Sequence, residues 1–122
     1  MSANTPDADT FLVIRDALRR FAAERDWDQF HSPKNLAAAL CVEAAELLEH
    51  FQWLTDDASK LLSAGQLEKV QEEMADVLLY LIRLADKLDV NLLEAAARKI
   101  EINSRNYPPD KARGSSRKYT EL

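Results

Sequence analysis

The sequence predicts an all-α protein, and three observations lead to this prediction. Aliphatic residues and alanine dominate the chain of 122 residues. Residues that interrupt helices are scarce, with only two glycines and four prolines. No stretch alternates β-branched and polar residues as a half-buried strand would. A chain of this length suits one ordinary domain with one core, so we expect residues 1–122 to form a single domain.

The first predicted helix spans residues 9–25, after a polar segment, residues 1–8, that we expect to be frayed. Its apolar residues recur at helical spacing on one stripe, and they are Phe11, Ile14, Leu18 and Phe21. The aromatic segment 25–31 breaks this period. Ser32 and Pro33 then predict a helix start, because serine caps the first turn and proline is tolerated at the first helical position.

Three further helices follow. The second spans residues 33–53, and the polar segment 55–63 after it has room for one short helical turn. The third spans residues 66–88, and the fourth, residues 91–103, opens with the spacing of a capping box. We expect residues 107–122 to form an irregular basic tail. Four helices with short connections predict a four-helix bundle or a pair of helical hairpins.

Two nearly repeated motifs place acids within the apolar stripes of the second and third helices. The first reads EAAELL from Glu43, and the second reads EMADVL from Glu73. The second acid of each motif, Glu46 or Asp76, follows three residues later on the same helix face. Burying a leucine gains about 1.5–3 kcal/mol, whereas burying an unpaired carboxylate costs several. Acids within a stripe that should be buried therefore need an explanation.

Two explanations compete. In one, the acids are half-exposed and pair with Lys69 and His50, which stand one helical turn from Glu73 and Glu46; such pairs contribute little. In the other, the four acids hold a cation, and we favour it because the motif occurs on two helical elements. Four carboxylates form an all-oxygen site that suits magnesium or manganese. A di-iron site would need a histidine three residues after a glutamate, which neither His31 nor His50 provides.

The charge balance narrows the class of substrate and partner. A hard divalent site in a chain of net charge −5 suggests a polyphosphate substrate that is held through the metal rather than by arginines. Lys99 and Asn103 share a face of the fourth helix and could contact such a substrate, although an ordinary exposed face explains them equally well. The acidic balance argues against a nucleic acid polymer as partner.

The sequence also bears on location and assembly. It has no signal peptide and no apolar run long enough to cross a membrane, so we expect a cytoplasmic protein. The single cysteine should be buried in a reducing compartment. Two helices carry apolar residues on a second side, which are Cys41, Leu48, Leu78, Ile82 and Ala85. Helices that are apolar on two sides need cover on both, so we expect a homo-oligomer.

The paired acid motifs resemble those of the MazG-like superfamily of all-α nucleotide pyrophosphohydrolases, in which ExxE is followed after a spacer by ExxD. The resemblance is nearest to the dCTP pyrophosphatase branch and covers residues 21–122. It rests on four further stretches, which are FAAERDW from Phe21, QFH from Gln29, FQW from Phe51 and SSRKYTEL from Ser115. Two positions depart from that branch, with Leu18 in place of a histidine and Asn106 in place of an arginine.

The resemblance implies magnesium-dependent hydrolysis of dCTP or a modified dCTP to the monophosphate and pyrophosphate, which cleans the nucleotide pool. It implies that Glu43, Glu46, Glu73 and Asp76 are the catalytic metal ligands. It assigns Trp27 and Trp53 to the base pocket, His31 and Tyr80 to the site, and Lys99 and Asn103 to phosphate or sugar. It further implies a tetramer, built as a dimer of dimers with shared sites.

Several alternatives remain open at this point. The same chemistry could act on dUTP or another noncanonical nucleotide. The chain could instead be a non-catalytic helical oligomer that binds a nucleotide or a partner helix. Within the enzymatic interpretation, either Glu46 or Glu72 could accept the proton of the attacking water.

Overall fold

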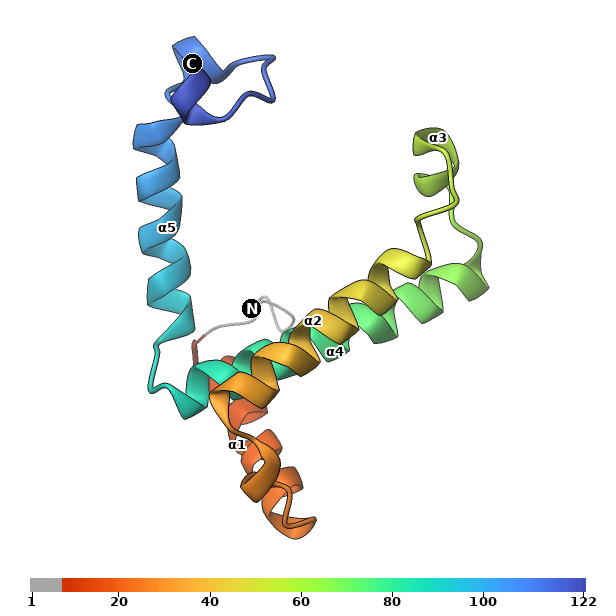
Figure 1. Ribbon diagram of the computed structural model, residues 1–122, viewed down its shortest axis with the longest axis vertical. Coiled ribbons are helices and arrows are strands. Elements are labelled where there is room, and N and C mark those ends of the chain that lie inside the picture. The colour runs from red at the N-terminus through yellow and green to blue at the C-terminus, as the bar shows by residue number, and fades with distance from the viewer. Residues whose placement is uncertain (1–7) are drawn as a thin grey trace, which may run out of the picture. The chain divides into compact units, whose positions relative to one another are not determined.

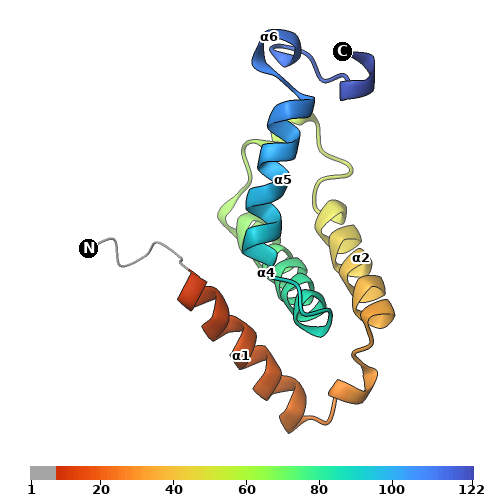
Figure 2. The same ribbon diagram turned by 90° about the vertical axis from the view of Figure 1, so that its left-hand side faces the viewer.

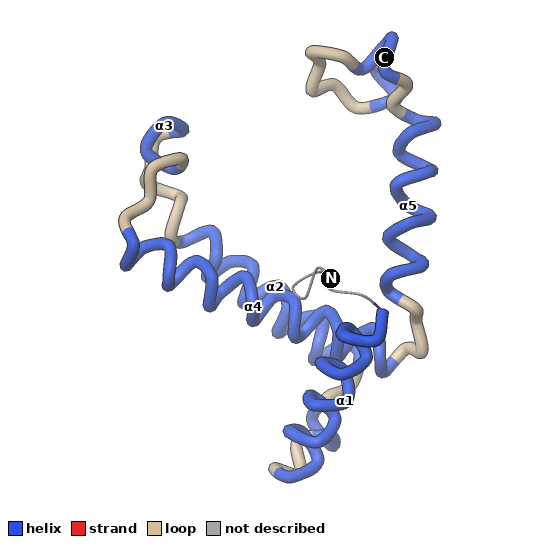
Figure 3. The backbone as a smooth tube through the Cα atoms, turned by 180° about the vertical axis from the view of Figure 1, so that it is seen from behind, coloured by secondary structure: helices blue, strands red, loops and turns tan. Residues whose placement is uncertain are grey.

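The computed structural model describes residues 8–122. Every regular element in this range is helical, which confirms the all-α prediction (Figures 1 and 3). The long helices are α1 (Ala8–Glu24), α2 (Pro33–Glu49), α4 (Ala64–Lys87) and α5 (Leu92–Asn106). The short elements are η1 (Asp28–Phe30), α3 (Asp56–Ser59), α6 (Pro109–Ala112) and η2 (Tyr119–Glu121). The predicted fraying concerns residues that lie outside the described range, except for Ala8, at which α1 begins.

Side-chain caps explain where the helices begin. The Ser32 hydroxyl accepts a hydrogen bond from the Asn35 backbone N–H at 3.1 Å, with Pro33 in the first turn of α2 as predicted. Ser63 and Gln66 form a reciprocal capping box, with bonds of 3.2 Å and 2.8 Å between side chain and backbone. This box satisfies two of the free N–H groups at the helix end. Helix α4 therefore begins at Ala64, earlier than the predicted residue 66.

Helix α2 ends earlier than predicted, at Glu49 rather than at residue 53. The next residues form tight turns, in which the Phe51 N–H donates to the Leu48 carbonyl and the Leu54 N–H to the Phe51 carbonyl, both at 2.9 Å. The physical reason is the cap that follows. Thr55 caps α3 from an extended backbone with ψ of 163°, so the chain must leave the helix before it. Helix α3 confirms the predicted short turn.

The chain divides into two compact units, and the first is Met1–Asp89. In this unit α2 and α4 run antiparallel, side by side, and α1 packs on α4 (Figure 2). The buried apolar side chains of the core are Ala22, Leu36, Val70, Ile82 and Ala85. None of the helices in residues 8–122 is both long and apolar enough to cross a lipid bilayer.

The sequence predicts apolar residues on a second side of α2 and α4, and only some of these residues are exposed to solvent. Ile82 and Ala85 are buried within the chain, because α1 covers this end of α4. Leu48 and Leu78 remain exposed, with 58% and 45% of their surface accessible. Cys41 is exposed as well, so the predicted burial of this cysteine is wrong for the single chain.

The second unit, Val90–Leu122, contains α5, α6 and η2. Helix α5 begins after Asn91, whose side chain accepts a hydrogen bond from the Glu94 N–H at 3.1 Å, and runs to Asn106 rather than to residue 103. We expected an irregular tail, but part of it is helical. Pro109 starts α6, since proline fits a first helical turn, and Tyr107 and Tyr119 meet edge to face at 5.9 Å. A single domain and a four-helix bundle stay predictions.

Candidate active site

The two acid motifs meet where α2 and α4 pack together. Glu43, Glu73 and Asp76 each present a carboxylate oxygen, and these atoms lie within 4.8 Å of one another. Glu43 and Glu73 are half-buried, and Asp76 is exposed. One oxygen of each glutamate, Oε2, is buried without a hydrogen-bond partner. Buried polar atoms are nearly always satisfied, so this pair of oxygens marks a place that suits a positively charged ligand.

Electrostatics support the same interpretation. Burial, followed by the Glu46 carboxyl and the charge of Asp76, raises the pKa of Glu43 to about 7. Burial and the charge of Glu46 also raise the pKa of Glu73. Glu46 is thus part of the cluster electrostatically, although its oxygens are not among those within 4.8 Å. Crowded acids favour the neutral form, and a nearby cation reverses this preference. The donor set and the orphaned oxygens fit a metal ion.

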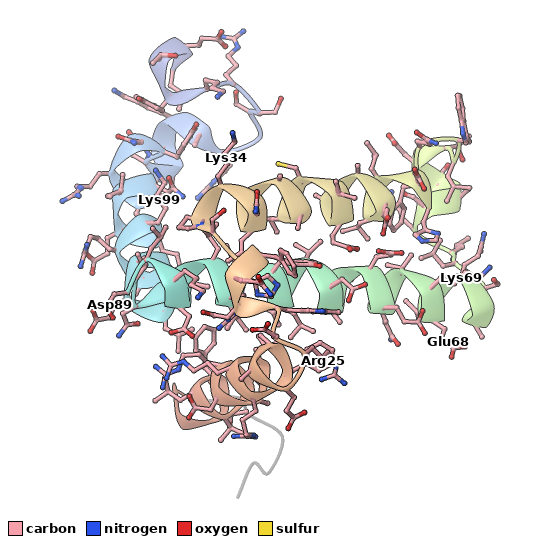
Figure 4. All side chains as sticks on the ribbon, turned by 60° about the horizontal axis from the view of Figure 1, so that its bottom comes forward. Arg25, Lys34, Glu68, Lys69, Asp89 and Lys99 are labelled. Carbon is pink, nitrogen blue, oxygen red and sulfur yellow. The ribbon has the colours of Figure 1, made fainter. Side chains whose placement is uncertain are left out.

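The alternative, in which surface pairs neutralise the acids, finds little support. Neither the Lys69–Glu73 pair nor the His50–Glu46 pair occurs among the ion pairs of residues 8–122; His50 Nε2 instead lies 4.0 Å from Glu73 Oε1. Lys69 is exposed and projects outward near the start of α4 (Figure 4). One distant imidazole leaves most of the negative charge of the cluster uncompensated.

A cavity of about 240 Å³ lies between α1, the two residues that flank η1, and α4, and Asp76 joins it to the acid cluster. Its lining comprises Leu18, Phe21, Ala22, Trp27, His31, Asp76, Leu79, Tyr80 and Arg83. Three residues that the sequence assigns to the site, Trp27, His31 and Tyr80, are therefore brought together beside the acids. An apolar cavity of roughly 150 Å³ admits benzene, so this cavity has room for a single pyrimidine ring.

The end of α1 explains how the aromatic residues reach the cavity. Asp26 adopts a left-handed backbone with φ of 53°, and the Trp27 N–H donates to the Ala22 carbonyl at 2.9 Å. This is the hydrogen-bond pattern of a Schellman motif, which reverses the chain. The reversal lays Trp27 edge to face against Phe21 at 5.6 Å and against His31 at 6.5 Å.

Sequence reasoning missed Arg83, which lines the cavity with only 6% of its surface exposed. Its Nε donates to His31 Nδ1 at 3.2 Å, and its Nη2 donates to Asp28. A signal was present, because Arg83 stands three residues after Tyr80 and seven after Asp76. These spacings place all three side chains on one helix face. An arginine on this face could therefore be assigned to the site from the sequence together with Tyr80.

Within the first unit, one predicted site residue is not brought to the cluster. Trp53 lies in the turn after α2 with 88% of its surface exposed, and it lines neither this cavity nor the acid cluster. Lys99 and Asn103 stand one turn apart on α5, in the second unit, and both are exposed. Their roles stay predictions.

Comparison with known proteins extends these observations. The sequence model of the MazG-like family matches residues 38–122. The dCTP pyrophosphatase 1 of Homo sapiens is 50% identical over 115 residues, which are 93% of this chain and 68% of that protein. The Bos taurus protein of the same name is 45% identical over the same shares.

A solved structure is similar as well. The crystal structure of a pyrophosphatase from Archaeoglobus fulgidus has a TM-score of 0.75 and 40% identity to this chain, and the match covers 88% of this chain and 99% of that one. The helical fold and the resemblance read from the paired acid motifs are thereby confirmed. The chain belongs to the MazG-like family.

Proposed function

We propose that this protein hydrolyses dCTP, or dCTP modified at position 5, to the nucleoside monophosphate and pyrophosphate. The observation that carries the proposal is the convergence of Glu43, Glu73 and Asp76, with two orphaned buried oxygens, beside a cavity of pyrimidine size. Relatives that are 50% and 45% identical and carry the name dCTP pyrophosphatase 1 support the choice of substrate. Cleaning of the nucleotide pool is the corresponding cellular role.

Magnesium is the ion that we infer for the cluster, with manganese as a substitute. Glu43, Glu46, Glu73 and Asp76 would hold it, because hard divalent cations prefer carboxylate oxygens. When bound, such an ion supplies neutralisation of phosphate charge and activation of water. The raised pKa of Glu43 and Glu73 shows that the cluster resists full ionisation without a cation, and this supports an ion as part of the working site.

Residues of the chain would bind the base, accept a proton from the attacking water and contact the phosphates or sugar. Aromatic and histidine side chains of the cavity hold the base, while the triphosphate extends past Asp76 towards the other acids. Glu46 or Glu72 accepts a proton as water oxygen bonds to the α-phosphorus. The bond from the α-phosphorus to the bridging oxygen breaks, and pyrophosphate leaves. Lys99 and Asn103 are proposed contacts for phosphate or sugar.

The assembly that we propose is a homotetramer, arranged as a dimer of dimers. Leu48 on α2 and Leu78 on α4 expose apolar surface that a second copy could cover, which supports it. The side chain of Trp53, 88% exposed, would then reach a base bound by a neighbouring subunit. The cytoplasmic location expected from the sequence stays a prediction.

A substrate panel tests the proposed function. Purified protein with magnesium should release pyrophosphate from dCTP and from 5-methyl-dCTP faster than from dUTP, dATP or a deoxyribose triphosphate that lacks a base. Chelation with EDTA should stop the release, and added magnesium should restore it. Faster hydrolysis of dUTP or of a purine nucleotide would show that a cytosine nucleotide is not the preferred substrate. Pyrophosphate release that persists in EDTA would contradict the metal-dependent chemistry.

A further inference from the structure

Arg83 is held from three sides. Its Nε donates to His31 Nδ1 at 3.2 Å, its Nη2 donates to Asp28, and its Nη1 lies 3.7 Å from Asp86 Oδ2. The Arg83 side chain is only 8% exposed, and that of Asp86 is 11% exposed. A planar guanidinium fixed by two carboxylates has little freedom to rotate. Its Nε–H therefore points at the imidazole in a set direction.

This contact determines which nitrogen of His31 carries the proton. A guanidinium has only hydrogen-bond donors, so the imidazole nitrogen that faces it must be unprotonated. A neutral His31 then carries its proton on Nε2. Among residues 8–122, no hydrogen bond uses this Nε2–H, although His31 lines the cavity. The ring thus has one unused donor at the site where we place the base.

The charges around the ring favour the same neutral form. Burial lowers the pKa of His31, and the positive charges of Arg83 and Lys87 lower it further, while Asp28 opposes them. Asp76 is the acid in the lining of the cavity. Near pH 7 the imidazole is therefore neutral, and Arg83 selects which of the two neutral tautomers is present.

We propose that Arg83 is a positioning residue that fixes His31 as an Nε2–H donor towards a ring-nitrogen or carbonyl acceptor of the bound pyrimidine. This inference rests on the proposed function for the identity of the occupant. The tautomer itself does not depend on that function and can be measured without substrate. Arg83 acts through His31 and need not touch the nucleotide.

The first test reads the tautomer directly. Long-range ¹⁵N–¹H correlation spectra distinguish the two neutral forms, and the chain has only two histidines, so His50→Gln assigns the signals. Wild-type protein at pH 7.5 should show His31 protonated on Nε2. Arg83→Lys should give a mixture of tautomers, with a His31 pKa closer to 6.5, the ordinary value. Arg19→Lys alters an ion pair of Asp86, which also contacts Arg83. This variant should leave the tautomer and the pKa of His31 unchanged.

The second test is kinetic. Arg83→Lys should raise KM for dCTP by about 2- to 12-fold, the value of one hydrogen bond, with kcat unchanged. In a His31→Ala background the same substitution should add nothing, because the two residues act as one unit. An Nδ1–H tautomer in the wild type, equal spectra for Arg83→Lys and Arg19→Lys, or additive losses would each overturn the proposal. Wild-type protein inert towards dCTP would refute the proposed function instead, while the spectra would still decide the role of Arg83.

Discussion

Glu43 stands where the apolar stripe of α2 meets α4, and this environment shifts the pKa of its carboxyl group. Burial and the neighbouring carboxylates raise its pKa from 4.5 to about 7. Between these values the folded protein binds a proton that the unfolded chain releases. The Glu43 carboxyl therefore contributes stability that is lost as the pH rises through this window.

We predict that, in EDTA, the melting temperature of the protein decreases from pH 5 to pH 8. Glu43→Gln should flatten this dependence, because the amide keeps the shape of the neutral carboxyl and cannot ionise. Glu68→Gln changes an exposed acid outside the cluster on the same helix (Figure 4), and should preserve the slope. Thermal unfolding followed by circular dichroism measures all three proteins. A Glu43→Gln variant with the same slope as wild type would show that this carboxyl is not the titrating group.

At the scale of single helices, the caps decide where each element begins. Ser32, Thr55, Ser63 and Asn91 all accept a hydrogen bond from a backbone N–H of the first turn. Each cap satisfies a donor that the helix itself leaves free. The box at Ser63 matters most for the site, since it starts the helix that carries Glu73, Asp76 and Tyr80.

Ser63→Ala should lower the free energy of unfolding by about 1 kcal/mol, within a range of roughly 0.5–2. The loss should appear in urea denaturation as a lower midpoint with an unchanged slope. Ser116→Ala is the matched control, because Ser116 caps no helix in residues 8–122, and it should leave the midpoint in place. Equal midpoints for both variants would mean that the capping box contributes nothing in solution.

How far the sequence could predict this site depends on the range of the interactions involved. The acid cluster was predictable, because helical spacing alone puts Glu43 and Glu73 on apolar stripes, and two such stripes pack together. The helix face of Arg83 could be read from its spacing to Tyr80, but its hydrogen bond to Asp28 could not, since Asp28 stands 55 residues away. The early end of α2 was missed because the helical period continues through Trp53, whereas the cap at Thr55 imposes an extended backbone.

At the scale of the whole molecule, the proposed association concerns exposed apolar side chains of α2 and α4. Val42 and Leu48 on α2 and Met74 and Leu78 on α4 each expose 45% or more of their surface. Two residues on the second apolar side of α4 differ in their exposure. Ile82 is 1% exposed and belongs to the core, whereas Leu78 is accessible. Only Leu78 can report on contacts between subunits.

We predict that Leu78→Asp yields a smaller species that keeps its helical circular dichroism, because the new charge would have to be buried in an apolar contact only in the assembly. Ile82→Asp should unfold the chain, since it places the charge in the core. Multi-angle light scattering with size-exclusion chromatography measures the mass of wild type and variant. A wild-type monomer, or a Leu78→Asp variant with the mass of the wild-type oligomer, would refute assembly through this face.

Substitution of one residue in the acid cluster is the most direct test of what the protein does. Asp76→Asn removes one charge from the cluster but keeps the size of the side chain, and Glu68→Gln does the same outside the cluster. Pyrophosphate release from dCTP should be measured for both variants with magnesium at saturation. We predict that Asp76→Asn loses more than 100-fold in turnover, beyond the 10–100-fold typical of a residue that only supports a metal ligand, while Glu68→Gln matches wild type. An Asp76→Asn variant that keeps more than about a tenth of wild-type turnover, a smaller loss than even a supporting residue typically gives, would contradict a catalytic metal site at these residues.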